Sequence, residues 1–456
     1  MENKINNFIK TNNLRLLNNL TELDDIKVVL IDAYGVFWDG SKIIEKTVSD
    51  MKNLIQKDIM VVVISNTTQI SSKAIESYKK RGMYLGEHFN YFITSGELFK
   101  HYVEAGNIKN LIFLKKSIKL LEDEIKILNL SLSKKEEYEQ HLENEIKEKI
   151  QQIDLIINNI KNEFEIQDIN LNELDTKLEL YNKYNIYQTK LNLFNDIIKS
   201  LNSVKLTQVE LKQQKTNKQI KIYIHGAPNT ELFSGEKGEK NFIITTNFDE
   251  ADAVYLGIPQ YTQEEIDNIL VNLTNFDKKN LKKSTIQNID KKERFDSIDL
   301  ELFKPFIDKC KDKIILNANP DKTASEKDAN TGEKNQVVRN GMITEEMKKR
   351  DYKIIEIGKP NKEIFDFALK KTLETKQFNT SIEELKQQTV MVGDTIETDI
   401  KGAEESGIKR NILVLGSGSV SSKKIEEDKL KQLDNLLSVN NELFVYLSQE
   451  KMLPNK

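Results

Sequence analysis

Cysteine, proline and histidine are scarce in this chain of 456 residues. The single cysteine, Cys310, excludes an intramolecular disulfide, and four scattered histidines offer no zinc-binding cluster. No run of eighteen apolar residues occurs, and the first twenty residues lack an apolar core, so we expect neither a membrane span nor a signal peptide. These absences favour a protein of the reducing cytoplasm.

Neither sign of charge predominates. The chain has 68 Lys and Arg against 72 Asp and Glu, a formal net charge of -4. This balance gives no general attraction to nucleic acid or to an anionic membrane, so we expect neither as a partner. With 38% hydrophobic residues, the chain can fill the cores of two or three domains.

An aspartate ends the first strongly apolar segment. Val28–Ile31 predicts a buried strand, and residues 32–40 follow it with the sequence DAYGVFWDG. A parallel sheet places its chemistry at such strand ends. Taken alone, the pattern also fits a strand that simply stops at a turn. Three further segments favour the functional interpretation.

The first two of these segments place a hydroxyl and a lysine after strands. Val61–Ile64 leads to Ser65 and Asn66, where a hydroxyl and main-chain N–H groups suit a phosphate oxygen. Ile354–Ile357 leads to Lys359, whose charge can neutralise a phosphoryl group. An ordinary turn and a solvated lysine are the alternatives when each segment is considered alone.

The third segment delivers a pair of acids. Thr389–Val392 predicts a strand that leads through Gly393 to Asp394, and Asp399 follows five residues later. A helix-capping pair is the simpler interpretation. A metal site is favoured over it because Gly393 allows a close approach of the main chain.

In this order, an aspartate, a hydroxyl, a lysine and an acid pair resemble the haloacid dehalogenase-like (HAD) superfamily of hydrolases. The pattern D-x-x-G-V-x-W-x-G, the segment TSGEL at residues 94–98 and Asn319-Pro320-Asp321 are similar to its subfamily IIA. That group includes p-nitrophenylphosphatase-like, nucleotide and pyridoxal phosphate phosphatases. The resemblance implies an α/β fold: a three-layer Rossmann-like parallel sheet with an inserted α/β cap of the C2 type.

The resemblance also implies a Mg2+-dependent phosphatase of a small phosphorylated metabolite. Asp32 would attack phosphorus and form an aspartyl phosphate, while Lys359 offsets negative charge. Asp32, the main-chain carbonyl of Tyr34 and Asp394 would bind Mg2+, with Asp399 in or behind this ligand set. We therefore expect the carboxylates of Asp32 and Asp394 to lie within reach of one ion.

Substrate contacts are expected at three further places. By resemblance, Ser65 and Asn66 hold a phosphate oxygen, and Gly40 on the loop after Asp32 belongs to the same binding region. The resemblance directs Asn319 and Asp321 toward the substrate. A plain Asn-Pro-Asp turn explains these last two residues equally well.

Tyr34 departs from the family pattern. HAD phosphatases usually carry a second aspartate at this place, two residues after the nucleophile, for general acid–base catalysis. A phenol with a pKa near 10 is a poor base at neutral pH, so turnover should be slow unless another group substitutes. Asp39 could do so, although the sequence favours a turn role for it.

Three alternatives to a phosphatase follow from the same residues. The sequence Asp-Ala-Tyr-Gly is similar to true 2-haloacid dehalogenases, which use no metal, but the Gly-Asp-x4-Asp pattern speaks against them. A catalytically silent relative could bind a phosphorylated ligand. An interaction protein could act through a helical insertion, although it would not need the charged positions.

The alternation of strands and helices predicts an interrupted core. Residues 20–98 and 346–440 form the expected core, with strands near 27–32, 60–65 and 90–94, and residues 99–345 form the cap. Within the cap, residues 115–218 lack Pro and Gly and repeat apolar residues every three or four positions. This spacing predicts an antiparallel helical hairpin, which either packs on itself or offers a surface to a second copy or protein partner.

Overall fold

The computed structural model describes residues 15–113, 115–116, 119, 151, 219–273, 275–286, 290–375, 378–415 and 442–448. The chain divides into one unit of residues 1–105 and 221–456 and another of residues 106–220. The contacts discussed below lie in the first unit. The expected helical hairpin of residues 115–218 falls almost wholly outside the described residues.

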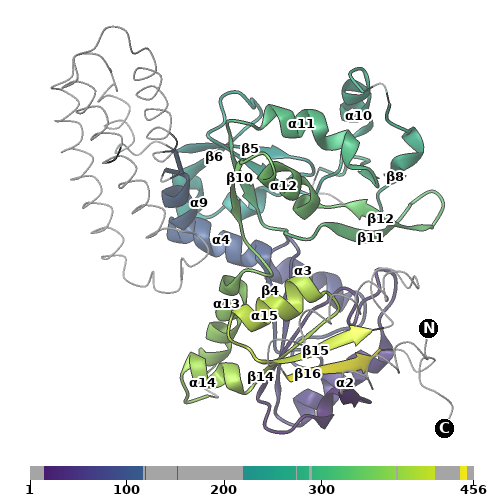
Figure 1. The fold of residues 1–456 in the computed structure, drawn as a ribbon, viewed down its shortest axis with the longest axis vertical. Helices are drawn as coiled ribbons and strands as arrows, with labels where there is room; N and C mark the ends of the chain where they lie inside the picture. Colours follow the sequence, from purple (N-terminus) through teal and green to yellow (C-terminus); the bar gives the residue numbers. More distant parts are fainter. Residues whose placement is uncertain are drawn as a thin grey trace. The chain divides into compact units, whose positions relative to one another are not determined.

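A seven-stranded sheet carries the strands that precede Asp32, Ser65 and Asp394 (Figure 1). Its order is β1-β16-β15-β14-β2-β3-β4, and each strand runs parallel to its neighbours. The strands expected near 27–32, 60–65 and 90–94 are confirmed. The bounds are β1 (Arg15–Leu17), β2 (Val28–Ile31), β3 (Met60–Ser65), β4 (Tyr91–Thr94), β14 (Thr389–Gly393), β15 (Arg410–Leu415) and β16 (Glu442–Leu447).

Both faces of this sheet are buried. Val29 and Ile31 of β2 lie in one apolar cluster with Met51 and Leu54 of a helix, while Leu30, which points the other way, is also fully buried. A parallel sheet buried on both faces is typical of a three-layer α/β fold. The helical elements are η1 (Leu20–Glu22), α2 (Glu45–Gln56), α3 (Ser71–Lys79), α4 (Ser95–Ala105), α13 (Lys362–Leu373), α14 (Ile382–Gln387), the π-helical turn η6 (Ile396–Ile400) and α15 (Lys401–Glu405).

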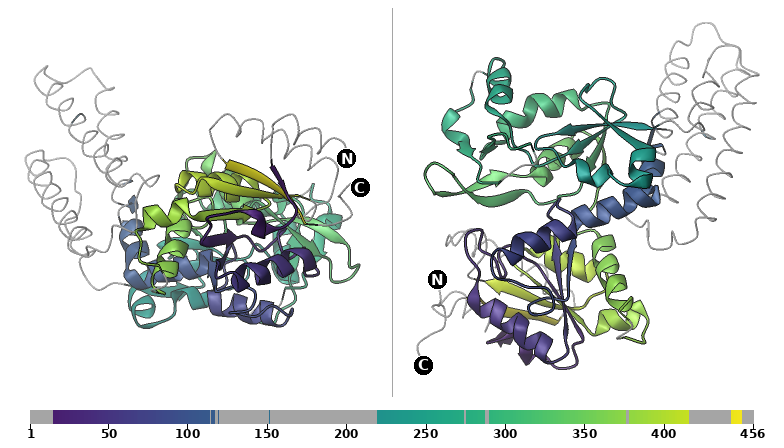
Figure 2. Two further views of the ribbon diagram at one scale, coloured as in Figure 1. Left: turned by 90° about the horizontal axis from the view of Figure 1, so that it is seen from below. Right: turned by 180° about the vertical axis from the view of Figure 1, so that it is seen from behind.

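A second sheet follows in the sequence (Figure 2). Its order is β13-β10-β7-β5-β6, with β13, β10, β7 and β5 parallel. The bounds are β5 (Ile220–His225), β6 (Phe242–Thr245), β7 (Ala253–Leu256), β10 (Ile314–Asn317) and β13 (Lys353–Glu356). Its helical elements are η3 (Thr230–Phe233), α9 (Glu236–Asn241), α10 (Gln263–Leu270), η4 (Lys278–Asn280), η5 (Leu300–Phe303), α11 (Lys304–Lys309) and α12 (Asn340–Lys348).

Two antiparallel hairpins accompany this second sheet. One pairs β8 (Leu281–Lys283) with β9 (Phe295–Ser297), and the other, hairpin β11–β12, pairs Thr323–Lys327 with Lys334–Val338. The second parallel sheet agrees with the expected α/β insertion. Among the described residues, no helix has the length and apolar character needed to cross a membrane.

One boundary differs from the sequence prediction. The core was expected to resume at residue 346, but Lys353–Glu356 pairs in register with Ile314–Asn317 of the second sheet. The second sheet therefore continues to Glu356, and Lys359 lies in the return to the core. A four-residue apolar strand does not encode which of two parallel sheets it joins.

Candidate active site

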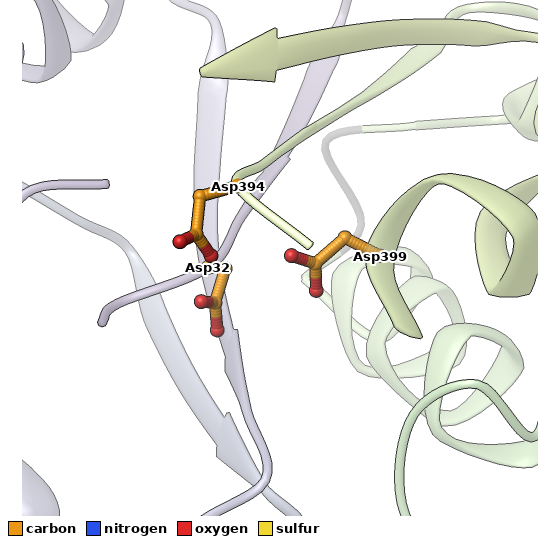
Figure 3. A group of neighbouring side chains, drawn as sticks. All are labelled: Asp32, Asp394 and Asp399. Atoms are coloured by element: carbon orange, nitrogen blue, oxygen red, sulfur yellow. The ribbon is translucent and has the colours of Figure 1, made fainter. Parts of the chain in front are cut away.

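Three aspartates meet at the carboxyl ends of β2 and β14. The two strands are neighbours, and the main-chain N–H of Asp32 donates to the carbonyl oxygen of Val392 over 2.9 Å. Asp32, Asp394 and Asp399, here called the acid cluster, are all buried and bring one carboxylate oxygen each within 4.8 Å of one another (Figure 3). The expected approach of Asp32 and Asp394 is confirmed.

Two glycines make room for these carboxylates. A Cβ atom on Gly35 would lie 2.3 Å from Oδ2 of Asp394, and Gly35 also has a φ of +79°. A Cβ atom on Gly393 would lie 2.3 Å from the Cβ of Asp399. Any larger residue at either place would displace an acid, so the two glycines are part of the site's construction.

Lys359 joins the acid cluster from the loop after β13. Its Nζ donates to Oδ1 of Asp32 over 2.6 Å and to Oδ1 of Asp399 over 2.7 Å. The other oxygen of Asp399 accepts the main-chain N–H of Thr395 over 3.0 Å. Lys359 is therefore not a solvated surface lysine, because it holds the predicted nucleophile and one acid together in a buried position.

Burial and charge act on the pKa values of this group. Burial raises the pKa of Asp32, the carboxylates of Asp399 and Asp394 add to this rise, and Lys359 opposes it. Burial alone would lower the pKa of Lys359, but Asp32 and Asp399 raise it above its usual value, so Lys359 remains a cation. Three carboxylates face one lysine, which leaves two excess negative charges when all are ionised.

Asn66 fixes the main chain around Lys359. Its Oδ1 accepts the N–H of Lys359 over 2.7 Å, and its Nδ2 donates to the carbonyl oxygen of Lys359 over 3.0 Å and to Oδ1 of Asp321 over 2.8 Å. The side-chain amide is thus engaged by the protein itself. A phosphate contact at Asn66 would therefore be left to its main-chain N–H.

The segment Asn319-Pro320-Asp321 is both a turn and part of the site. Oδ1 of Asn319 accepts the N–H of Asp321 over 3.1 Å, which is a turn contact. The carboxylate of Asp321 nevertheless faces Asn66, and burial raises its pKa. Asp321 thus lies near the acid cluster, whereas Asn319 stabilises the turn.

The segment TSGEL builds the entry to α4. The hydroxyl of Thr94 donates to the carbonyl oxygen of Gln69 over 2.6 Å and accepts the N–H of Glu97 over 2.9 Å. The hydroxyl of Ser95 donates to the carbonyl oxygen of Ser65 over 3.2 Å. This motif therefore supports the loop that follows β3.

Tyr34 and Asp39 lie on the loop after Asp32, and both have protein partners. The Tyr34 hydroxyl donates to the carbonyl oxygen of Ser325 over 2.6 Å. Burial raises the pKa of Tyr34 above its ordinary value, so the phenol is protonated at neutral pH. Oδ1 of Asp39 accepts the N–H groups of Ser41 and Lys42 over 2.7 and 2.8 Å, which is the turn role expected for it.

The donor set of the acid cluster fits a hard divalent cation. Ligand oxygens on opposite sides of one Mg2+ lie about 4 Å apart, because each bond measures about 2.0–2.1 Å. The carboxylate oxygens here lie within 4.8 Å of one another and carry excess negative charge. The expectation of Mg2+ therefore rests on oxygen ligands, buried charge and spacing that suit it.

Two family models match the segments that carry these residues. The family described as haloacid dehalogenase-like hydrolase matches residues 29–126, and the HAD-hydrolase-like family matches residues 356–437. Both segments contain acids of the cluster, and the second contains Lys359. The two matches support a HAD-like hydrolase as the enzyme class, and together they cover every residue of the acid cluster.

Comparison with solved structures gives distant matches that span most of the chain. A haloacid dehalogenase-like hydrolase from Brucella suis is 11% identical, with 88% of this chain and 89% of that chain covered and a TM-score of 0.48. NagD from E. coli K-12 is 15% identical, with 92% and 96% covered and a TM-score of 0.38. p-Nitrophenyl phosphatase from Archaeoglobus fulgidus is 14% identical, with 93% and 95% covered and a TM-score of 0.40. No curated protein matches the chain.

Proposed function

We propose that the protein is a Mg2+-dependent phosphatase of HAD subfamily IIA that hydrolyses a small phosphorylated metabolite at Asp32. The observation that carries the proposal is the buried contact of Lys359 with Asp32 and Asp399 beside Asp394. A lysine and three acids at the ends of parallel strands suit phosphoryl transfer, in which charge must be held in place.

The chemistry assigned to Asp32 has two steps. A carboxylate oxygen of Asp32 forms a bond to phosphorus while the bond to the leaving oxygen breaks, which gives an aspartyl phosphate and an alcohol that takes up a proton. Water then attacks phosphorus, releases inorganic phosphate and restores the carboxylate. Lys359 holds Asp32 in position and favours its carboxylate form, which attacks in the first step and leaves in the second.

Asp32 and Asp394 are the proposed side-chain ligands of Mg2+, together with the main-chain carbonyl of Tyr34. Both oxygens of Asp399 accept hydrogen bonds, from Lys359 and from Thr395, so Asp399 is better suited to orient the site than to bind the ion first. When bound, Mg2+ supplies positive charge that offsets the phosphate oxygens and the acid cluster.

The proposed phosphate contacts are the Ser65 hydroxyl and the main-chain N–H of Asn66. The Asn66 side chain holds Lys359 and Asp321 instead. Asp321 and the loop at Gly40 are proposed to line the substrate's approach. A phosphorylated small molecule is the substrate class that follows from a phosphate site of this construction.

A catalytically silent protein that binds a phosphorylated ligand is the second candidate. One observation favours it: the Tyr34 hydroxyl, which occupies the place of the usual acid–base aspartate, is protonated and bonded to Ser325. Without a base to assist proton transfer, the site would hold the phosphorylated ligand without turning it over. The proposal of an interaction protein concerns residues 115–218, outside the described residues.

Turnover by purified full-length protein tests the proposal. The protein with Mg2+ would be screened against phosphorylated sugars, nucleotides and cofactors, and phosphate release measured. We expect Asp32→Asn to slow release at least on the order of a thousandfold. Asp50→Asn is the matched control, since Asp50 is also buried, but its carboxylate binds the N–H of Leu20 and the hydroxyl of Tyr446.

Three results would contradict the proposal. Activity that survives Asp32→Asn would indicate a contaminant or another nucleophile. An equal loss in Asp50→Asn would indicate that damage to the fold, and not the chemistry of Asp32, causes the effect. Binding of phosphorylated ligands without any turnover would favour the second candidate.

A further inference from the structure

The loop after Asp32 is tied to hairpin β11–β12 by two separate contacts. The first is the hydrogen bond of the Tyr34 hydroxyl to the carbonyl oxygen of Ser325, over 2.6 Å. Ser325 lies in β11 and is buried. Tyr34 is two residues from the proposed nucleophile, Asp32. This contact therefore holds the loop after Asp32, here called the catalytic loop, close to the proposed site of reaction.

The second contact lies at the other end of the same loop. Nζ of Lys334, the first residue of β12, donates to the carbonyl oxygen of Asp39 over 2.9 Å and lies 3.5 Å from its Oδ2. Because Ser325 and Lys334 belong to opposite strands of hairpin β11–β12, both strands hold the loop.

Gly40 provides the space for the first contact. A Cβ atom on Gly40 would lie 2.4 Å from the Tyr34 hydroxyl and 3.2 Å from the carbonyl oxygen of Ser325. Gly40 also has a φ of +86°, a backbone conformation that favours glycine. Gly40 was expected to belong to the phosphate-binding region. It also has a structural role, because the lack of a side chain leaves room for the Tyr34 ring beside the hairpin.

The hairpin is itself firmly held by its own surroundings. Arg339 follows β12, and its guanidinium donates to Asp296 over 2.8 Å and to Glu326, the neighbour of Ser325, over 2.9 Å. Near the turn, the N–H of Ala329 donates to the carbonyl oxygen of Lys283 over 2.8 Å. The hairpin is thus held near both ends by contacts other than those to the loop after Asp32.

We propose that Tyr34 is a positioning residue that fastens hairpin β11–β12 to the catalytic loop, in the place where related phosphatases carry an acid–base aspartate. Because this loop begins at Asp32, the fastening fixes the loop that a phosphorylated substrate meets at the site, and it affects how tightly that substrate is held. This role in substrate binding rests on the proposed phosphatase function, but the contact between loop and hairpin does not.

Hydrogen exchange of the full-length protein, followed by mass spectrometry, tests the contact without any substrate. Tyr34→Phe removes only the hydroxyl. We expect the amides of residues 323–338 to exchange about three- to tenfold faster in this variant, the range that loss of one hydrogen bond gives. Tyr446→Phe is the matched control, because it removes a buried tyrosine hydroxyl that donates to Asp50 over 3.0 Å. That control should leave residues 323–338 unchanged.

A second variant protects the test against misfolding of Tyr34→Phe. Lys334→Ala removes the other contact from a largely exposed side chain, and we expect about twofold faster exchange in residues 323–338. Lys221→Ala, which breaks the exposed pair of Lys221 with Glu250, is its control. Unchanged exchange in both Tyr34→Phe and Lys334→Ala would overturn the proposal.

Kinetics separate positioning from acid–base catalysis. With p-nitrophenyl phosphate and Mg2+, we expect Tyr34→Phe to raise KM about three- to tenfold while kcat falls less than about threefold. A fall in kcat of about a hundredfold at constant KM, with a changed pH profile, would make Tyr34 a catalytic residue and overturn the proposal. Absence of turnover in wild type would count against the phosphatase function alone, because the exchange result stands without it.

Discussion

Two buried clusters of charge in this protein are built differently. The cap cluster consists of Arg339, Asp296 and Glu326, and its guanidinium binds both acids while Gln260 donates to both oxygens of Asp296. The acid cluster offers Lys359 to Asp32 and Asp399 and adds Asp394 beside them. Arg339 contacts both acids of the first cluster, whereas Lys359 contacts two of the three acids in the second.

The difference suggests a way to distinguish charged groups that are buried for stability from those that are buried for function: whether the protein itself supplies the opposite charge. A buried acid is tolerated when the chain supplies a fixed partner, as Arg339 does with two hydrogen bonds. In the acid cluster, Lys359 supplies one positive charge beside three carboxylates. We infer that a bound cation completes this cluster.

Loss of Arg339 should have the largest effect on stability. Arg339→Met leaves Asp296 and Glu326 buried without their cation and should lower the free energy of unfolding by about 3–5 kcal/mol. Denaturant unfolding would measure this, and because Mg2+ should stabilise wild type and variant equally, the difference between them should persist in Mg2+. Arg350→Met is the control, since its more exposed pairs with Asp308 and Glu346 should affect the free energy of unfolding much less. If Mg2+ instead removed the difference between Arg339→Met and wild type, the two clusters could not be distinguished by their response to the ion.

Loss of Lys359 should show the opposite response to metal. Without Mg2+, Lys359→Met should cost about 3 kcal/mol, because Asp32 and Asp399 lose their buried partner. Millimolar Mg2+ should recover part of this loss by binding the folded state, and unfolding curves with and without the ion would measure the recovery. A variant that Mg2+ leaves unchanged would show that the ion does not offset this cluster.

A smaller effect, an increase in the rate of hydrolysis, is expected from a substitution of Tyr34, which stands where HAD phosphatases usually carry their acid–base aspartate. Tyr34→Asp should speed hydrolysis of p-nitrophenyl phosphate about tenfold or more, because the new carboxylate can activate water. Tyr34→Asn is the matched control, since it also loses the contact with Ser325 but supplies no base. If the two variants have equal rates, another residue supplies the base, and Asp39 would be tested next.

The smallest effect is expected from removal of the insertion. Replacing about residues 116–218 by a short Gly/Ser linker should leave both clusters folded, because the chain's first unit consists of residues 1–105 and 221–456. Circular dichroism and the Mg2+ response would measure this, and light scattering would measure any change in self-association. An insoluble or unfolded product would show that the insertion's apolar residues belong to the core.

The sequence was sufficient to predict the strands of the first sheet that lead to the site, because each is an apolar run followed by a polar residue. Apolar strands that end in Asp32, Ser65 and Asp394 were located because a buried parallel strand is a continuous apolar run with a polar end. The pairing of β13 with β10 was not predicted, since short strands carry no mark of their partner.

The contacts made by individual side chains were less accessible to sequence analysis. Asn66 was expected to bind phosphate, yet its amide holds Lys359 and Asp321. The partner of Tyr34 is the main-chain carbonyl of Ser325, and every residue type carries such an acceptor, so no sequence signal could have identified it. Contacts 291 positions apart depend on the folded arrangement alone.

Thermal unfolding with and without Mg2+ tests the central claim most directly. A hundredfold excess of Mg2+ over Kd should stabilise wild type by about 2–3 kcal/mol and raise its Tm. Asp296→Asn, in the cap cluster, should keep this shift even though its starting Tm is lower, whereas Asp394→Asn should lose it. A Tm shift in Asp394→Asn equal to that of wild type would contradict the account, because Mg2+ would then bind somewhere other than the acid cluster.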